Sequence, residues 1–121
     1  MKITIQLNPV TKKNSQQIIK IKNRYMIIPS KQYKQYEKEV KQFMPILDKP
    51  ISDMVNVKCL YYMKTKRKVD LNNLLEATTD VLVKYKVLED DNSNIVASHD
   101  GSRVLYDKDN PRTEIIITKC R

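Results

Sequence analysis

Glycine, histidine, cysteine and tryptophan are scarce in this chain of 121 residues. It has one glycine, one histidine, two cysteines and no tryptophan. Cys59 and Cys120 form no CxxC pair, and neither stands at a zinc-ligand spacing from His99. These absences argue against a structural zinc site and against a Cys–His nucleophilic pair. We expect both cysteines to be small, buried apolar residues.

Long apolar segments are also missing. No run of about 18 apolar residues occurs, so the sequence predicts no membrane-spanning helix. Residues 1–9, MKITIQLNP, alternate between polar and apolar side chains, whereas a signal peptide has a continuous apolar stretch. No basic amphipathic helix carries a large apolar face with Trp or Phe, which disfavours a membrane surface as partner. We therefore expect an intracellular, cytoplasmic protein without a membrane partner.

Acidic residues are outnumbered by basic ones. Lys plus Arg number 23 against 14 Asp plus Glu, which gives a net charge of +9. So much positive charge on a chain of this size favours nucleic acid as the partner. The alternative is a lysine-rich composition whose charges lie on solvated faces. An apolar content of 40% argues against disorder, and the length fits a single domain, residues 1–121.

The order of predicted elements is mixed. Alternating and β-branched residues predict strands, and apolar residues at helical spacing predict helices. The only glycine, Gly101, follows Asp100 in a two-residue turn signal, so the flanking strands are expected to pair across it. Strands are predicted at residues 2–7, 17–22, 24–28, 54–63, 94–99, 102–106 and 113–118, and helices at 31–44 and 71–84. This order favours one α+β domain, with a mixed β-sheet and two main helices packed on it.

The second predicted helix has a polar, acidic face. We expect Asp70 to cap the helix, because its carboxylate can accept hydrogen bonds from the free N–H groups of the first turn. Leucines at positions 71, 74, 75 and 82 share one face, and the opposite face carries Asn72, Asn73, Glu76 and Asp80. Acids four residues apart repel each other, which a metal ion or a nearby cation would relieve. The alternative is a set of acids that face solvent.

A second acidic group, Glu89, Asp90 and Asp91, follows this helix. Adjacent side chains of an extended segment point to opposite faces, so only one of Asp90 and Asp91 can share a site with the helix. The sequence leaves open which one. Carboxylates from a helix start and a following segment are suitable ligands for Mg²⁺. Such a site favours metal-assisted cleavage of a phosphodiester.

Cations flank these acids. Lys64, Lys66, Arg67 and Lys68 crowd just before Asp70 and could hold a phosphate backbone. We predict the following DNA contacts, which position the backbone without reading sequence: Lys12, Lys13, Lys64, Lys66, Arg67, Lys68 and Arg103. One of Tyr61 and Tyr62 is expected on the far side of the sheet, where it could stack on an unpaired base, although core packing is the alternative. His99 is either a surface residue or a phosphate contact or general acid.

The stretch KRKVDLNNLLEATTDVLVKYKVLEDDN, residues 66–92, resembles the signature of the RusA family of Holliday junction resolvases. That signature has a basic run, then Asp-x-Asp-Asn-Leu, a lysine one turn later, an Asp-x-Leu, and an Asp-Asp pair before a strand. The segments TKKN and TEIIIT are similar to the rest of the family's frame. This resemblance implies a small homodimeric endonuclease of recombination and repair, often carried by prophages.

The resemblance also implies the substrate and the site. The family binds four-way DNA junctions and nicks two strands symmetrically with Mg²⁺ or Mn²⁺. Its metal-binding acids match Asp70 and Asp91, and the first acid of its pair matches Asp90. Asp80 matches the later acid, and Asn73 matches an asparagine expected to be structural. A two-fold symmetric junction suits a two-fold dimer, for which the strands at 17–22 and 24–28 are candidate interfaces.

Two positions depart from the family pattern. Asn72 stands where the family has its second aspartate, and Glu76 where it has its lysine. An amide is a poorer ligand for a hard cation than a carboxylate. The chain is then a weakened or inactive nuclease that still binds branched DNA, an engineered form, or an enzyme with a rebuilt site. We favour the last, with Glu76 restoring a carboxylate near Asn72 on the same helix face.

Overall fold

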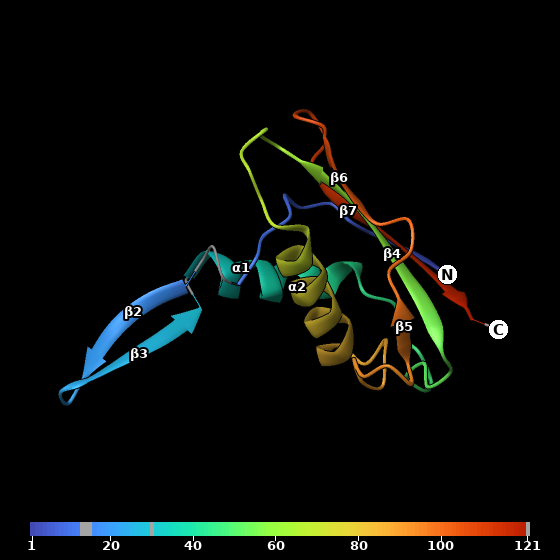
Figure 1. Cartoon of the computed structure of the whole chain (residues 1–121), viewed down its shortest axis with the longest axis horizontal. Coiled ribbons are helices and arrows are strands. Elements are labelled where there is room, and N and C mark those ends of the chain that lie inside the picture. The colour runs from blue at the N-terminus through green and yellow to red at the C-terminus, as the bar shows by residue number, and fades with distance from the viewer. Residues whose placement is uncertain (13–15, 30, 121) are drawn as a thin grey trace.

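The computed structural model describes residues 1–12, 16–29 and 31–120, with the backbone alone for 16–19 and 27–29. Its main layer is a mixed sheet (Figure 1). Its middle strands are β4 (Val55–Met63) and β7 (Arg112–Lys119), which pair antiparallel. β1 (Lys2–Ile5) pairs antiparallel with β7 on its other side. β5 (Val96–Ser98) and β6 (Arg103–Tyr106) run parallel to β4.

Two helices cover one face of this sheet (Figure 1). They are α1 (Lys31–Val40), which continues into the short 3-10 helix η2 (Lys41–Phe43), and α2 (Leu71–Lys84). Every second residue of β4 and β7 is buried beneath them, as period-2 alternation requires. The core between the layers includes Tyr33, Val40, Val57, Leu74, Leu82 and Ile115. The predicted α+β class, with a mixed sheet and two helices, is confirmed.

The predicted hairpin across Asp100-Gly101 is wrong. The turn exists, since Ser102 N donates to His99 O at 3.1 Å and Gly101 has a φ of 86°. However, β5 and β6 pair with β4 rather than with each other. The turn therefore interrupts one edge strand that follows β4 along most of its length.

Side chains replace the missing ladder bonds at this interruption. Asn56 Oδ1 accepts from Asp100 N at 2.7 Å, and Cys59 N donates to Ser102 Oγ at 2.9 Å. His99 Nδ1 lies 2.8 Å from Val57 O. β5 and β6 thus pair with the exposed edge of the nine-residue strand β4 and not with each other, because this edge offers more backbone polar groups to pair.

The remaining strands, β2 (Gln16–Ile21) and β3 (Arg24–Pro29), form the predicted hairpin. Lys22 and Asn23 have φ values of 48° and 66°, as a tight turn between paired strands requires. The hairpin extends away from the sheet and helices (Figure 1). Near its tip, Ile21 and Met26 are about half exposed and Tyr25 is 74% exposed.

Two further predictions from composition can be compared with the structure. Cys59 is buried as expected, but Cys120 is only partly buried. Among the described residues, no helix combines the length and the apolar character that a membrane crossing requires.

Candidate functional site

Asp70 caps α2, as the sequence predicts. It has extended backbone angles, and its Oδ1 accepts from Asn72 N at 2.9 Å. Its backbone oxygen accepts from Asn73 N and Leu74 N, which starts the helix. The carboxylate therefore lies at the positive end of the helix dipole, with its second oxygen outside this cap bond.

A hollow of about 280 Å³ lies beside the first turns of α2. Asn72 and Glu76 line it from the helix, Asp91 from the loop after the helix, and His99 from the segment that follows β5. Leu75, Thr79 and Val96 complete its wall. Asp70 precedes this turn of the helix and is not among the lining residues. The fold thus gathers two carboxylates, an amide and an imidazole from three segments that are apart in the sequence.

Asp90 and Asp91 have different surroundings in the structure. Asp90 accepts from Asp91 N at 2.7 Å and from Asn92 Nδ2 at 3.1 Å, so both its oxygens are engaged in the loop. The bond from the Asp91 backbone, above all, holds the pKa of Asp90 below its usual range. A hydrogen bond with the Asp90 carboxyl and, to a smaller extent, desolvation raise the pKa of Asp91, which is exposed. Asp91 is the member of the pair that lines the hollow.

Asp80, one helical turn after Glu76, is not among the residues that line this hollow. Its Oδ2 is 2.8 Å from Lys12 Nζ, in an ion pair that joins the N-terminal segment to the helix. Both side chains are about one-third exposed, so the pair contributes little to stability. Asp80 is therefore paired within the protein, and Lys12, predicted as a phosphate contact, has a protein partner. Lys13 lies outside the described residues.

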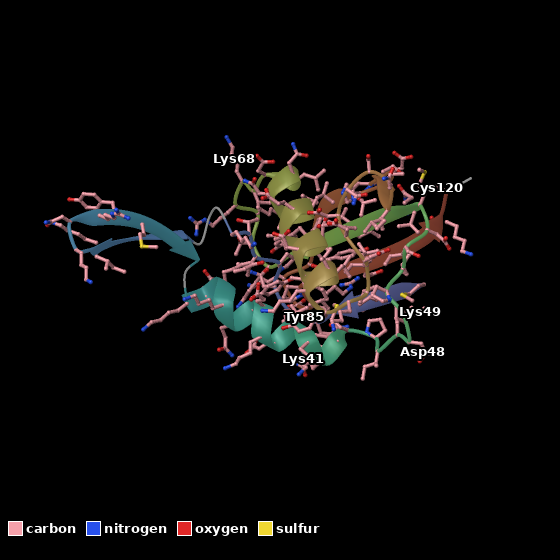
Figure 2. All side chains as sticks on the ribbon, turned by 90° about the horizontal axis from the view of Figure 1, so that it is seen from below. Lys41, Asp48, Lys49, Lys68, Tyr85 and Cys120 are labelled. Atoms are coloured by element: carbon pink, nitrogen blue, oxygen red, sulfur yellow. The ribbon has the colours of Figure 1, made fainter. Side chains whose placement is uncertain are left out.

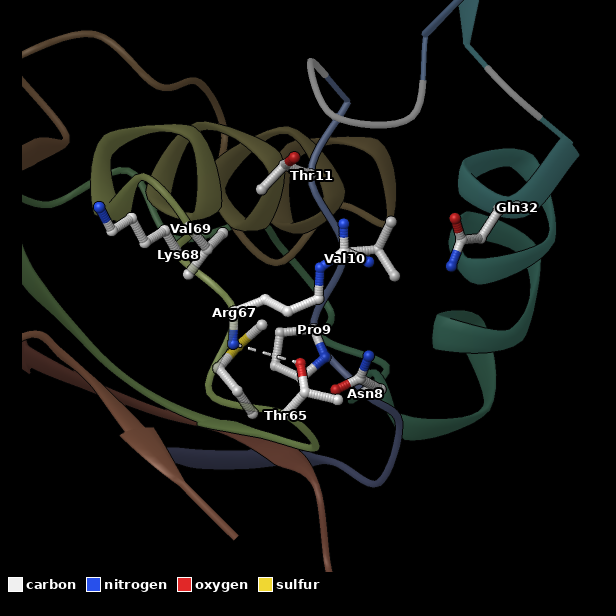
Figure 3. Close-up of a pocket in the computed structure, with 10 residues that line it drawn as sticks. Asn8, Pro9, Val10, Thr11, Gln32, Thr65, Arg67, Lys68 and Val69 are labelled. Carbon is white, nitrogen blue, oxygen red and sulfur yellow. Dashed lines mark hydrogen bonds between the residues drawn. The ribbon is translucent and has the colours of Figure 1, made fainter. Parts of the chain in front are cut away.

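The basic segment, residues 64–68, is exposed and lies beside the start of α2. Lys64 N donates to Asn8 Oδ1 at 3.0 Å, and Lys66 Nζ lies 5.0 Å from the centre of the Tyr106 ring. Arg67 and Lys68 line a second hollow of about 460 Å³, together with residues 8–11 and Gln32 (Figure 3). Lys68 projects outward at the start of α2, and Lys41 lies on the opposite side of the body (Figure 2). Arg103 is exposed at the start of β6.

The two tyrosines before the basic segment face opposite sides of the sheet. Tyr61 is buried, and its hydroxyl is 2.7 Å from Thr78 Oγ1. Tyr62 lies on the sheet face away from the helices, where the Arg112 guanidinium stacks 3.7 Å from its ring centre. Arg112 also pairs with Asp107 and Glu114. Tyr61 is therefore a core residue, and Tyr62 already has a stacking partner.

The donors in the smaller hollow suit a hard divalent cation in kind. Glu76 and Asp91 offer carboxylate oxygens and Asn72 an amide oxygen, the ligand types that Mg²⁺ and Mn²⁺ take. Within the described part of the chain, no three His, Cys, Asp or Glu side chains are close enough together to hold a metal ion. The hollow thus has the right donor chemistry without a converged set of ligands.

His99 is the member of the hollow that sequence reasoning placed least well. Its position beside a predicted hairpin tip favours a surface residue. In the structure His99 lies in the wall of the hollow, because the edge strand is interrupted beside it. A hydrogen bond with the backbone of β4 fixes the orientation of its ring. No spacing in the sequence reports this placement, because it depends on pairing between residues more than 40 positions apart.

A comparison with models of protein families matches the chain to one described as endodeoxyribonuclease RusA, over residues 6–118. The match leaves out only the first five and last three residues of the 121. No curated protein matches the chain. The match confirms the resemblance seen in residues 66–92 and extends it across both helices and every strand except β1. The chain belongs to the RusA family of endodeoxyribonucleases.

Proposed function

We propose that this protein is a divalent-metal-dependent endonuclease that binds four-way DNA junctions as a homodimer and resolves them by paired, symmetric nicks. One observation carries the proposal. Asp91 and Glu76 share a hollow beside a helix start that is preceded by an exposed basic segment, in a chain of an endodeoxyribonuclease family. Because the substrate is DNA, we expect the protein to act in the cytoplasm.

We assign different roles to the acidic residues of the site. In this proposal Asp91, Glu76 and Asp70 hold a Mg²⁺ or Mn²⁺ ion, with the Asn72 amide as a weaker donor. When bound, the ion supplies a polarised water and offsets charge on the phosphate. Asp90 acts as a positioning residue, because its bonds to Asp91 N and Asn92 fix the loop that carries Asp91. Asn73 and Asp80 are structural.

Glu76 is the residue that distinguishes a rebuilt site from a damaged one. Asn72 and Glu76 line the same hollow. This arrangement supports the idea that the Glu76 carboxylate, one helical turn away, takes the place of the family's aspartate at position 72. If so, Glu76→Gln abolishes metal-dependent cleavage and leaves junction binding intact. Asp48→Asn is the control, because it removes an exposed acid that does not line the hollow. Full cleavage by Glu76→Gln would refute the rebuilt site.

The basic segment supplies the phosphate contacts of the proposal, together with Arg103, Lys12 and Lys13. Neutralising Arg67 and Lys68 to Gln should weaken binding to every junction and reduce the slope of log affinity against log salt by roughly 0.9 per lost contact. Lys41→Gln is the control, since Lys41 lies on the opposite side of the body (Figure 2). An unchanged slope in the double variant would remove the basic segment from the interface.

The homodimer in this proposal uses the projecting β2–β3 hairpin. A two-stranded hairpin alone in water is marginally stable, so a partner surface would stabilise it. Ile21, Tyr25 and Met26 are exposed near its tip and offer apolar surface to a second copy. Tyr25→Glu should shift the protein from dimer to monomer in sedimentation velocity. A dimer that persists in this variant would place the interface elsewhere.

A branched-DNA-binding protein with weak or no catalysis is the alternative function. Asn72 is the observation that favours it, since the family's second aspartate is absent there. This alternative predicts salt-sensitive junction binding without any metal requirement. It also predicts that Asn72→Asp creates or restores cleavage.

A further inference from the structure

We propose that His99 is a nitrogen ligand of the site and that it makes this chain prefer Mn²⁺ to Mg²⁺. The proposal rests on the metal-dependent function proposed above and adds a residue that the family pattern does not contain. It starts from the position of the imidazole ring, which is fixed by the backbone of β4 and lies in the wall of the acidic hollow.

The hydrogen bond of His99 determines which ring nitrogen is available. Nδ1 lies 2.8 Å from Val57 O. A carbonyl oxygen only accepts hydrogen bonds, so Nδ1 must carry the proton. In the neutral ring the lone pair is then on Nε2, at the edge of the ring away from β4. Metal-binding histidines commonly donate their other N–H to a backbone carbonyl in this way.

The interrupted edge strand explains why Val57 O is free to accept this bond. The parallel ladder pairs Asn56 with Ser98 and resumes only at Leu60 with Arg103. Between these points the β4 edge is satisfied by side chains, with Ser102 Oγ accepting from Cys59 N. The fold thus orients His99 through the same feature that disrupts the predicted hairpin.

The other residues of the hollow complete a mixed donor set. Glu76 and Asp91 supply carboxylates and Asn72 an amide, so His99 adds the only nitrogen donor among the side chains that line it. Oxygen-only sites suit Mg²⁺, whereas imidazole binds first-row transition metals more strongly. A site with two carboxylates and one imidazole should therefore favour Mn²⁺. Because no three of these groups yet lie within reach of one ion, binding must draw their side chains together.

The single histidine makes a direct test possible. The chain has only one imidazole, so its Cε1–H resonance in an NMR spectrum reports on His99 alone. Paramagnetic Mn²⁺, added to the full-length protein without DNA, should broaden this resonance at substoichiometric amounts, and excess EDTA should restore it. Asp91→Asn should abolish the broadening at the same metal concentration. Broadening that survives in Asp91→Asn, or none in the wild type, would overturn the proposal.

Metal affinity gives a second measurement, by isothermal titration calorimetry. His99→Gln should weaken Mn²⁺ binding by roughly tenfold or more and change Mg²⁺ binding by less than about twofold. Asp48→Asn, the control, should change neither, because Asp48 is exposed and does not line the hollow. Equal Mn²⁺ affinities in wild type and His99→Gln would refute the ligand role, while metal-dependent junction cleavage by the wild type would still uphold the proposed function. A wild-type protein that neither binds metal nor cleaves junctions would refute both the ligand role of His99 and the proposed function.

Discussion

Asp70 serves two purposes in this account, and two substitutions separate them. As a cap it accepts from Asn72 N at 2.9 Å, and as a carboxylate it carries charge to the site. Asparagine caps a helix as well as aspartate does, but it is neutral. Asp70→Asn should therefore keep the capping bond and lose the charge, whereas Asp70→Ala should lose both.

The magnitudes follow from the two contributions. Loss of a capping bond costs about 1 kcal/mol, and loss of a negative charge at an exposed helix start costs about 0.5 kcal/mol. Asp70→Ala should thus lower the free energy of unfolding by about 1.5 kcal/mol and Asp70→Asn by about 0.5 kcal/mol. Each kcal/mol should lower Tm by roughly 3–6 °C in a domain of this size.

The assay combines thermal unfolding, followed by circular dichroism, with junction binding and cleavage. We expect Asp70→Asn to bind junctions like the wild type and to cut none. Two results would refute the reasoning. Equal destabilisation by both substitutions would show that the capping bond does not matter, and wild-type cleavage by Asp70→Asn would show that the charge does not.

Two further predictions concern the sheet. Gly101→Ala should destabilise the protein by about 1–2 kcal/mol in urea unfolding, since the φ of Gly101 is 86° and an added Cβ would lie 3.1 Å from Lys58 Cδ. An unchanged free energy of unfolding would contradict the expectation that a side chain at this position strains the turn. Hydrogen bonding from Arg112, above all, lowers the pKa of Glu114. Below about pH 4.5, the usual glutamate value, the unfolded chain therefore takes up more protons than the native one. The contribution of the Arg112–Glu114 pair to the free energy of unfolding is thus present above that pH and is lost as pH falls through the lowered pKa of Glu114. Glu114→Gln should flatten the acid side of the stability profile, and an unchanged profile would exclude this ion pair as its cause.

Local signals in the sequence were sufficient for the site helix. The capping residue Asp70, followed by leucines at helical spacing, predicts both the start and the buried face of α2. The β2–β3 hairpin is equally local, because its strands are adjacent and its turn is short. Such features depend on neighbours within a few residues, which a single sequence displays directly.

Long-range pairing explains the errors. The Asp100-Gly101 signal correctly predicts a turn, but whether its flanking strands pair with each other depends on the free edge of β4, more than 40 residues earlier. The same distance conceals the place of His99 in the hollow. The sequence leaves the orientation of Asp90 and Asp91 open, because it depends on loop hydrogen bonds that alternation alone does not resolve.

Ion pairing adds a further limit. Lys12 and Asp80 are 68 residues apart in the chain, and nothing in their separate surroundings predicts their contact. From the sequence, Lys12 is predicted as a phosphate contact and Asp80 as a structural acid near the site, without a link between them. In the structure Asp80 pairs with Lys12 and, although it shares a helix with Glu76, does not line the acidic hollow.

Cleavage of a synthetic four-way junction by the wild-type protein is the most direct test of the central claim. Each strand is labelled in turn, and the reaction is followed with Mg²⁺ and then with Mn²⁺. We predict paired nicks at symmetric positions, dependent on the metal and lost in Asp91→Asn. Tight, salt-sensitive binding with no cuts in either metal would contradict the account and indicate a protein that only binds branched DNA.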